Sequence, residues 1–202
     1  MPDNHDQERL SLQELLCAKS VSFGSFTLAS GAVSDVYVDA KLTTCSPEAM
    51  PLIGRIFLHE IKLRGWLPEA VGGLTIGADP IAFAIARESL ETSRPIGAFI
   101  VRKEPKAHGR QKLIEGLEPT AGRRVVIIDD VCTKGGSTAQ AVRNARDAGM
   151  QVIGAMCLVD REMGATELLQ REFSIDLAAV FKLSELQPAY DKCLAGAGTA
   201  HT

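Results

Sequence analysis

The residues with the clearest chemistry lie in the stretch 125–138, which reads VVIIDDVCTKGGST. Four β-branched apolar residues predict a buried strand, and two carboxylates, Asp129 and Asp130, follow it directly. A glycine- and hydroxyl-rich turn then leads into a helix-like segment, 139–148. Backbone N–H groups of such a turn and of a helix start favour an anion. Carboxylates accept hydrogen bonds from sugar hydroxyls or hold hydrated magnesium, so the stretch predicts a sugar-phosphate site.

The stretch 125–138 differs from two common nucleotide-binding turns. It lacks the GxxxxGK[ST] spacing of a nucleotide P-loop, and its acids precede its glycines, unlike the GxGxxG dinucleotide turn. An ordinary polar turn between a strand and a helix is the alternative. That alternative gives no reason for two adjacent carboxylates after a buried strand, so we interpret the stretch as a binding site.

Strand-like and helix-like segments alternate along the chain, which predicts an α/β fold with a mostly parallel central sheet flanked by helices. A hairpin is expected around Ser30-Gly31, and five further strands are expected at 69–73, 96–101, 124–128, 152–159 and 176–181. Ligands of such sheets bind at the carboxyl ends of the strands. We therefore expect four segments to meet at one crevice: 72–80, 102–116, 129–138 and 160–164.

Helix boundaries are predicted from capping residues. Ser46, which precedes a proline, is expected to cap a helix that buries the apolar side chains at 53, 56, 57 and 61. Asp79, also before a proline, is expected to cap the next helix. Residues 102–122 show no hydrophobic periodicity, so we expect a long loop there. We expect a frayed tail after residue 190.

The composition is typical of a soluble globular protein, with 202 residues, of which 46% are apolar and 23% charged. A net charge of −3 disfavours a nucleic-acid-binding protein, and no apolar run is long enough to cross a membrane. The polar N-terminus does not resemble a signal peptide, and five cysteines without metal-binding spacing are typical of a reducing cytoplasm. Cys132 is either a packed apolar side chain or a reactive thiol.

The chain resembles a known protein family. The stretch 125–138 is similar to the phosphoribosyl pyrophosphate (PRPP) signature of type I phosphoribosyltransferases. Three further segments narrow the resemblance: FTLASG at 26–31 with Ser34 and the YVD of 37–39, RKEPKAHG at 102–109 with IEG at 114–116, and Asp160-Arg161. Together they resemble the orotate phosphoribosyltransferase family over residues 23–164.

The resemblance implies a single phosphoribosyltransferase domain over 1–202, with a hood at 1–45, an α/β core at 46–185 and a flexible tail at 190–202. It implies a homodimer in which the loop 102–116 reaches the neighbouring site, and Mg²⁺ held by substrate and water without direct protein ligands. Lys106, His108 and Asp130 are implied as catalytic residues, and Thr133 and Arg161 as orotate-binding. The implied PRPP-binding residues are Arg102, Lys103, Lys106, His108, Asp129, Asp130, Val131, Cys132, Thr133, Lys134, Gly135, Gly136 and Ser137.

The basic run is interpreted as a mobile lid, although a solvated charge run is the alternative. Its basic side chains are Arg102, Lys103, Lys106, His108, Arg110 and Lys112. As the bond from ribose C1 to pyrophosphate breaks, the leaving group gains negative charge, and nearby cations stabilise that state more than the ground state. One contact at about 4 Å with an effective dielectric near 20 contributes roughly 4 kcal/mol before desolvation. Closure of a lid would also exclude water.

The loop 72–80 is similar to the family's pyrophosphate loop, with a cis peptide implied at Thr75–Ile76; a plain strand-to-helix turn is the alternative. The chain departs from the family where Ala29 and Gly77 replace lysines of some relatives, and where Lys134 replaces a small residue. Lys134 either restores a charge near the 5′-phosphate or points to solvent. Two other functions share the PRPP motif: a purine phosphoribosyltransferase and a PRPP-sensing regulator. Arg161 disfavours a purine, which has no carboxylate to pair with it.

Overall fold

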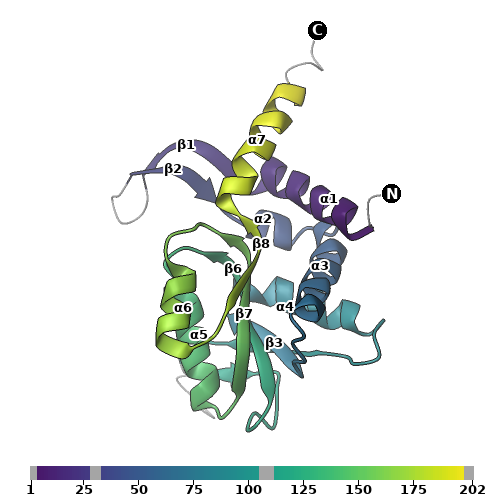
Figure 1. The fold of residues 1–202 in the computed structure, drawn as a ribbon, viewed down its shortest axis with the longest axis vertical. Coiled ribbons are helices and arrows are strands. Elements are labelled where there is room, and N and C mark those ends of the chain that lie inside the picture. Colours follow the sequence, from purple (N-terminus) through teal and green to yellow (C-terminus); the bar gives the residue numbers. More distant parts are fainter. Residues whose placement is uncertain (1–3, 28–32, 105–111, 198–202) are drawn as a thin grey trace.

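A six-stranded sheet forms the centre of the molecule, in a computed structural model that describes residues 4–27, 33–104 and 112–197 (Figure 1). The strand order is β5-β4-β3-β6-β7-β8, and every neighbouring pair is parallel except β4 and β5. The strands are β3 (Ala70–Leu74), β4 (Gly97–Val101), β5 (Ile114–Glu115), β6 (Arg124–Cys132), β7 (Gln151–Asp160) and β8 (Leu177–Lys182). The predicted α/β class with a mostly parallel sheet is therefore confirmed.

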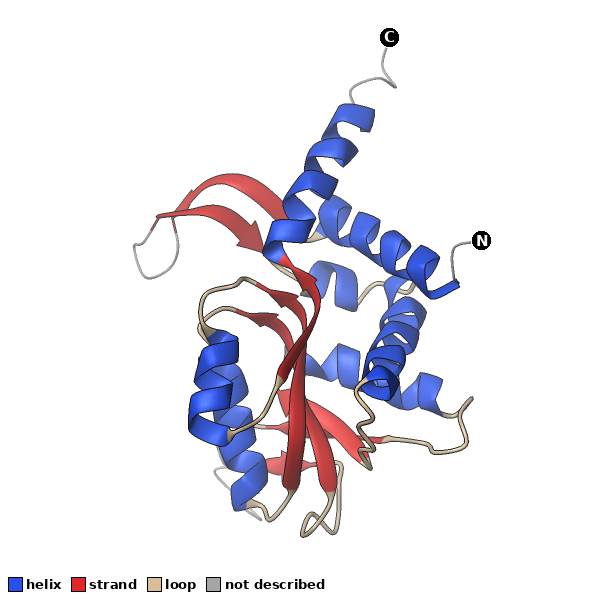
Figure 2. Cartoon of the chain, viewed as in Figure 1, coloured by secondary structure: helices blue, strands red, loops and turns tan. Residues whose placement is uncertain are grey.

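Helices cover both faces of this sheet (Figure 2). One face carries α3 (Ala49–Leu63) and α4 (Ala78–Ser89), and the other carries α5 (Gly136–Asp147) and α6 (Ala165–Phe173). The predicted inner side chains of α3 are buried, namely Ile53, Ile56, Phe57 and Ile61. They pack with apolar residues of α4 and of the central strands in one core cluster, which fixes the helices against the sheet.

A smaller layer lies over one end of the sheet (Figure 1). It contains α1 (Asn4–Lys19), the antiparallel pair β1 (Val21–Thr27) and β2 (Val33–Val38), α2 (Lys41–Thr44) and α7 (Leu183–Ala197). The predicted hairpin is confirmed, while its tip at 28–32, which includes Ala29, lies outside the described residues. Because β1 and β2 form a sheet of their own, this layer, called the hood below, approaches the core without joining its ladder.

Both predicted helix caps are wrong. The helix α3 begins at Ala49 without a side-chain cap, and Ser46 lies in the turn after α2, where its carbonyl accepts bonds from the N–H groups of Ala49 and Met50. The helix α4 begins one residue before Asp79, whose carboxylate accepts a hydrogen bond from the Thr75 hydroxyl instead (2.6 Å). In both places a different local hydrogen-bond arrangement replaces the expected side-chain cap.

Three predicted boundaries also change. The loop expected at 102–122 contains β5, which pairs with β4 and forms the edge of the sheet. The strand expected to end at 128 continues as β6 through both aspartates to Cys132, because its ladder with β7 extends to the pair Cys132–Asp160. The expected tail is helical to the end of α7, which packs against α1 and buries Leu186. Packing on α1, rather than a strong local pattern, stabilises this helix.

The order in which the chain adds strands to the sheet changes direction between β3 and β6. From β3 it moves to β4 on one side, and it then returns to the other side of β3 for β6, β7 and β8. A crevice opens at such a switch point, outside the carboxyl ends of the two strands. The described part of the chain contains no helix long and apolar enough to cross a membrane.

Candidate active site

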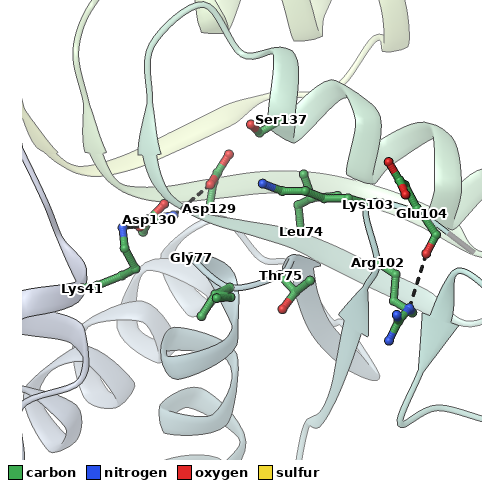
Figure 3. A pocket seen from close by; sticks show the side chains of 11 residues that line it. Lys41, Leu74, Thr75, Gly77, Arg102, Lys103, Glu104, Asp129, Asp130 and Ser137 are labelled. Carbon is green, nitrogen blue, oxygen red and sulfur yellow. Dashed lines mark hydrogen bonds and ion pairs between the residues drawn. The ribbon is translucent and has the colours of Figure 1, made fainter. Parts of the chain in front are cut away.

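Two adjoining cavities lie at the carboxyl ends of β3 and β6, of about 720 Å³ and about 540 Å³. Asp129 and Ser137 line both of them, so the two form one continuous site. The larger cavity, shown in Figure 3, lies between the segments after β3 and β4, the aspartate pair and α2. The smaller is enclosed by the turn before α5, by Arg161 and by β2. The four segments expected to converge do contribute to this site, apart from the undescribed residues 105–111.

Asp129 is the buried member of the aspartate pair. Only 7% of its surface is exposed, and its Oδ2 accepts a hydrogen bond from Thr138 Oγ1 (2.7 Å) on α5. Its Oδ1 accepts a hydrogen bond from the N–H of Asp130 (3.0 Å). Burial raises the pKa of Asp129 to about 7, although the Thr138 bond opposes this shift. Asp129 therefore changes its charge near neutral pH.

Asp130 lies on the other face of the strand, because successive residues of a strand alternate in direction. Its Oδ1 accepts a hydrogen bond from the N–H of Val131 (2.9 Å), and its Oδ2 lies 3.6 Å from the ammonium nitrogen of Lys41. Gly77 packs against this carboxylate, since a Cβ added to Gly77 would lie 2.6 Å from Asp130 Cγ. The pair thus presents one buried and one accessible carboxylate to the larger cavity.

The glycines of the loop 72–80 have two different roles. Gly72 and Gly73 lie inside β3, where an added Cβ would lie 2.7 Å from Phe99 Cγ and 2.8 Å from Ala78 Cβ, respectively. Their small size serves strand and helix packing. Gly77, in contrast, lines the larger cavity beside Thr75 and Ile76, whose peptide bond is cis as the resemblance implied.

The turn between β6 and α5 exposes the start of a helix to the smaller cavity. Gly135 precedes α5 with a left-handed φ of +77° and has no side chain to cap the first turn. The helix spans 12 residues, so its first N–H groups and its positive dipole end are available to an anion. The expected residues that line this cavity are Val131, Cys132, Thr133, Lys134, Gly135, Gly136 and Ser137, with Lys134 exposed.

Cys132 is buried (1% exposed), and its sulfur lies 3.2 Å from Thr138 Oγ1. It packs with Cys157 of β7 and with Ala165 at the start of α6. Of the two interpretations of Cys132, this environment favours a packed side chain over a reactive thiol, because reactive cysteines are at least partly exposed.

Arg161 reaches the smaller cavity from the end of β7. Its backbone N–H donates to the carbonyl of Cys132 (2.8 Å), and its Nη2 donates to Ser34 Oγ (3.2 Å) on β2. Its Nε is buried and has no hydrogen-bond partner among the residues that the structure describes. A half-buried guanidinium group that lines a cavity suits a bidentate carboxylate ligand.

Arg102 and Lys103 follow β4 and line the larger cavity. The guanidinium group of Arg102 pairs with Glu115 of β5 (3.3 Å), and α5 holds both backbones through side-chain bonds from Gln140 and Asn144 to their carbonyl groups. The start of the basic segment is therefore anchored at the site. Lys106 and His108 lie outside the described residues.

The sequence prediction missed Lys41 as a residue of the site. It also missed that Thr138 is the hydrogen-bond partner of Asp129. Lys41 follows the quoted segment 37–39 by two positions, so its place directly after a hood strand was the available signal. Thr138 was read only as part of the phosphate turn. Its burial and its bond to Asp129 follow from the fold of α5 onto β6.

The geometry agrees with three comparisons to known proteins. The phosphoribosyl transferase domain family matches residues 68–181. An orotate phosphoribosyltransferase of Aquifex aeolicus is 46% identical over 182 residues, which cover 89% of this chain and 97% of the relative. The chain belongs to the orotate phosphoribosyltransferase family. Another member of that family, from Mycobacterium bovis, is 45% identical over 165 residues, covering 82% of this chain and 89% of the relative.

Solved structures of the orotate phosphoribosyltransferase family share this fold. The Mycobacterium tuberculosis enzyme in complex with Fe(III) dicitrate has a TM-score of 0.78 and 42% identity, covering 89% of this chain and 99% of that one. The same enzyme in complex with PRPP has a TM-score of 0.74 and 38% identity, covering 89% and 98%. An adenine phosphoribosyltransferase from Leishmania tarentolae is similar at 18% identity, with a TM-score of 0.65 and coverage of 89% and 91%, and it shares the fold alone.

Proposed function

We propose that this protein transfers the phosphoribosyl group of PRPP to orotate, releasing orotidine 5′-monophosphate and pyrophosphate, in the biosynthesis of UMP. The observation that carries the proposal is the half-buried side chain of Arg161, which lines the same cavity as the phosphate turn and whose Nε has no hydrogen-bond partner among the described residues. A carboxylated base and a phosphorylated sugar can then bind side by side. Family membership supports this assignment.

Each half of the site has its own part in the proposed reaction. The first turn of α5 binds the 5′-phosphate, Asp129 and Asp130 accept hydrogen bonds from the ribose hydroxyls, and the diphosphate occupies the larger cavity near Lys103. Arg161 and Thr133 orient orotate in the smaller cavity. A ring nitrogen of orotate then bonds to ribose C1 while the bond from C1 to the diphosphate oxygen breaks, so no protein nucleophile is required.

Magnesium fits the aspartate pair as a partner of the substrate. The described residues form no cluster of three or more potential metal ligands, whereas two carboxylates face the larger cavity. Mg²⁺ commonly binds through one or two carboxylates, substrate phosphates and water. We therefore propose that Asp129 and Asp130 contact its water shell, and that the ion offsets negative charge on the diphosphate.

The cations for the leaving group come, in this proposal, from Lys103 and from Lys106 and His108 of the basic loop. We further propose a homodimer in which the loop 102–116 closes over the neighbouring site. Support comes from the anchoring of residues 102 and 103 beside the cavity, and from the family resemblance of the loop. A cytoplasmic location, without nucleic-acid or membrane partners, stays a prediction from the sequence.

Separate assays with PRPP and orotate, adenine, hypoxanthine or xanthine test the function. We expect turnover with orotate alone, because only orotate offers a carboxylate to Arg161. Turnover with a purine alone would favour a purine phosphoribosyltransferase. Binding of PRPP without turnover of any base would favour a PRPP-sensing regulator. Arg161→Lys serves as the matched variant, since lysine keeps the charge but loses the planar fork.

A further inference from the structure

Lys41 brings a positive charge into the larger cavity from the hood. It is the first residue of α2, and its ammonium nitrogen lies 2.8 Å from Asp39 Oδ1 and 3.6 Å from Asp130 Oδ2. In Figure 3 the Lys41 side chain lies beside Asp130, across the cavity from Arg102. Among the described residues, Lys41 is the sole ion-pair partner of Asp130. The residue therefore connects the hood to the carboxylate that faces the ligand space.

The backbone that carries Lys41 is held firmly. The N–H of Asp39 donates to the carbonyl of Ser20 (2.9 Å), and the N–H of Lys41 donates to Asp39 Oδ1 (3.2 Å). Two residues further on, the Thr43 hydroxyl is buried against the Ser20 hydroxyl at 2.6 Å. The Lys41 side chain itself is 46% exposed, so its ammonium group can respond to a ligand while its backbone stays in place.

The loop after β3 cannot supply a positive charge beside Asp130. The part of the wall formed by the loop after β3 consists of Thr75, Ile76 and Gly77, none of which is charged, and the Thr75 hydroxyl already donates to Asp79. A side chain at Gly77 would need a Cβ 2.6 Å from Asp130 Cγ, well inside normal contact distance. As long as Asp130 keeps its position, this loop cannot place a cation beside it, whereas the hood does so with Lys41.

A diphosphate in this cavity meets two carboxylates that repel it. Asp129 and Asp130 both line the larger cavity, and the guanidinium group of Arg102 is already paired with Glu115. Opposite charges at about 3 to 4 Å attract strongly in a partly desolvated cavity, so an ammonium group beside Asp130 lowers the repulsion. The same group fixes the direction in which the carboxylate points.

We infer that Lys41 is a positioning residue of the PRPP half of the site, an inference that rests on the proposed function. Its ammonium group holds the Asp130 carboxylate toward the ribose hydroxyls and offsets the repulsion between this carboxylate and the diphosphate. Lys41 thereby compensates, from the hood, for the uncharged loop at Gly77.

The test compares Lys41→Met, Lys41→Arg and the control Lys62→Met, whose lysine is exposed at the end of α3. Calorimetry measures the Kd of PRPP, and steady-state kinetics give KM for each substrate. For Lys41→Met we expect the Kd and KM of PRPP to rise by about tenfold or more, with KM for orotate changed by less than about twofold. Lys41→Arg should restore most of the affinity, and Lys62→Met should match the wild type.

A second measurement asks whether Lys41 acts through Asp130. In an Asp130→Asn background, Lys41→Met should have less than about half of its effect on log Kd, because contacting residues are not additive. Unchanged PRPP affinity in Lys41→Met, equal changes in both KM values, or a lower melting temperature with full additivity would each overturn the inference. Wild-type protein that binds PRPP but does not use orotate would overturn the proposed function instead, and the Kd comparison would still decide the role of Lys41.

Discussion

Arg161, at the end of a core strand, donates a hydrogen bond from its Nη2 to Ser34 Oγ of the hood at 3.2 Å, across 127 positions of sequence. Lys41 makes a second contact between the hood and the core, at Asp130 in the other half of the site. The hood therefore contacts one residue in each substrate half. Its position over the carboxyl ends of the strands makes both contacts geometrically available (Figure 1).

Ser34→Ala should weaken orotate binding selectively. A lost hydrogen bond of about 1 kcal/mol raises KM for orotate roughly fivefold, while KM for PRPP should stay unchanged. Arg161→Ala should have a larger effect in the same direction. Ser25→Ala, at an exposed position of the same hairpin, is the control. Parallel increases in both KM values would mean that Ser34 supports the hood as a whole rather than Arg161.

Gly77→Ala should displace the Asp130 carboxylate, because the new Cβ would lie 2.6 Å from its Cγ. Loss of a hydrogen bond to a charged group costs about 1.5–3 kcal/mol, so KM for PRPP should rise by about 10- to 100-fold. Gly97→Ala is the matched control, since its Cβ would meet its nearest neighbour at an ordinary 3.6 Å. Wild-type affinity for PRPP in Gly77→Ala would show that Asp130 does not hold the sugar.

The pKa of Asp129, raised to about 7 mainly by burial, makes the stability of the ligand-free protein depend on pH. In the unfolded chain this carboxyl ionises near its ordinary value of 3.8, so between that value and pH 7 the folded state binds more protons. The contribution of Asp129 to stability is therefore greatest below pH 4, falls as pH rises to about 7, and then stays constant.

Replacing this carboxyl tests the pH dependence. The free energy of unfolding of Asp129→Asn, minus that of the wild type, should increase from pH 4 to pH 7 by up to ~4 kcal/mol, at about 1.4 kcal/mol per pKa unit. Urea titrations across this pH range measure the difference, and Asp176→Asn, at an exposed aspartate, is the control. A difference that does not vary with pH would contradict the raised pKa.

Mixing inactive subunits tests whether the loop 102–116 is shared. If Lys106 acts in the neighbouring site, subunits with Lys106→Ala and subunits with Asp130→Asn should together regain about a quarter of wild-type activity after random exchange in a twofold dimer. Half of the dimers are then mixed, and in each of them one of the two sites combines a wild-type Lys106 from one subunit with a wild-type Asp130 from the other. Mixing Lys106→Ala with the double variant is the control and should give no recovery. Absence of recovery after verified subunit exchange would place the loop over its own site.

Much of the site could be predicted from the sequence because its residues are neighbours in the chain. The aspartate pair, the phosphate turn and the basic run each form a short stretch whose chemistry is local. The alternation of strands and helices also predicted the parallel sheet, since burial on both faces imposes a recognisable pattern. Helix starts were harder. Asp79 accepts a hydrogen bond from Thr75, four residues earlier, and Ser46 lies in the turn before α3, and the capping preference includes neither arrangement.

By itself, the sequence predicted a sugar-phosphate site at 125–138 and determined that the fold is α/β. Only the tertiary structure decided how the two acids differ: Asp129 is buried under Thr138, while Asp130 lies between Gly77 and Lys41. It also decided that the hood supplies Lys41 and Ser34 to a site otherwise built by the core. The reason is physical, since burial and charge pairing depend on contacts between segments far apart in the chain, whereas the preference for a turn or strand is set by adjacent residues.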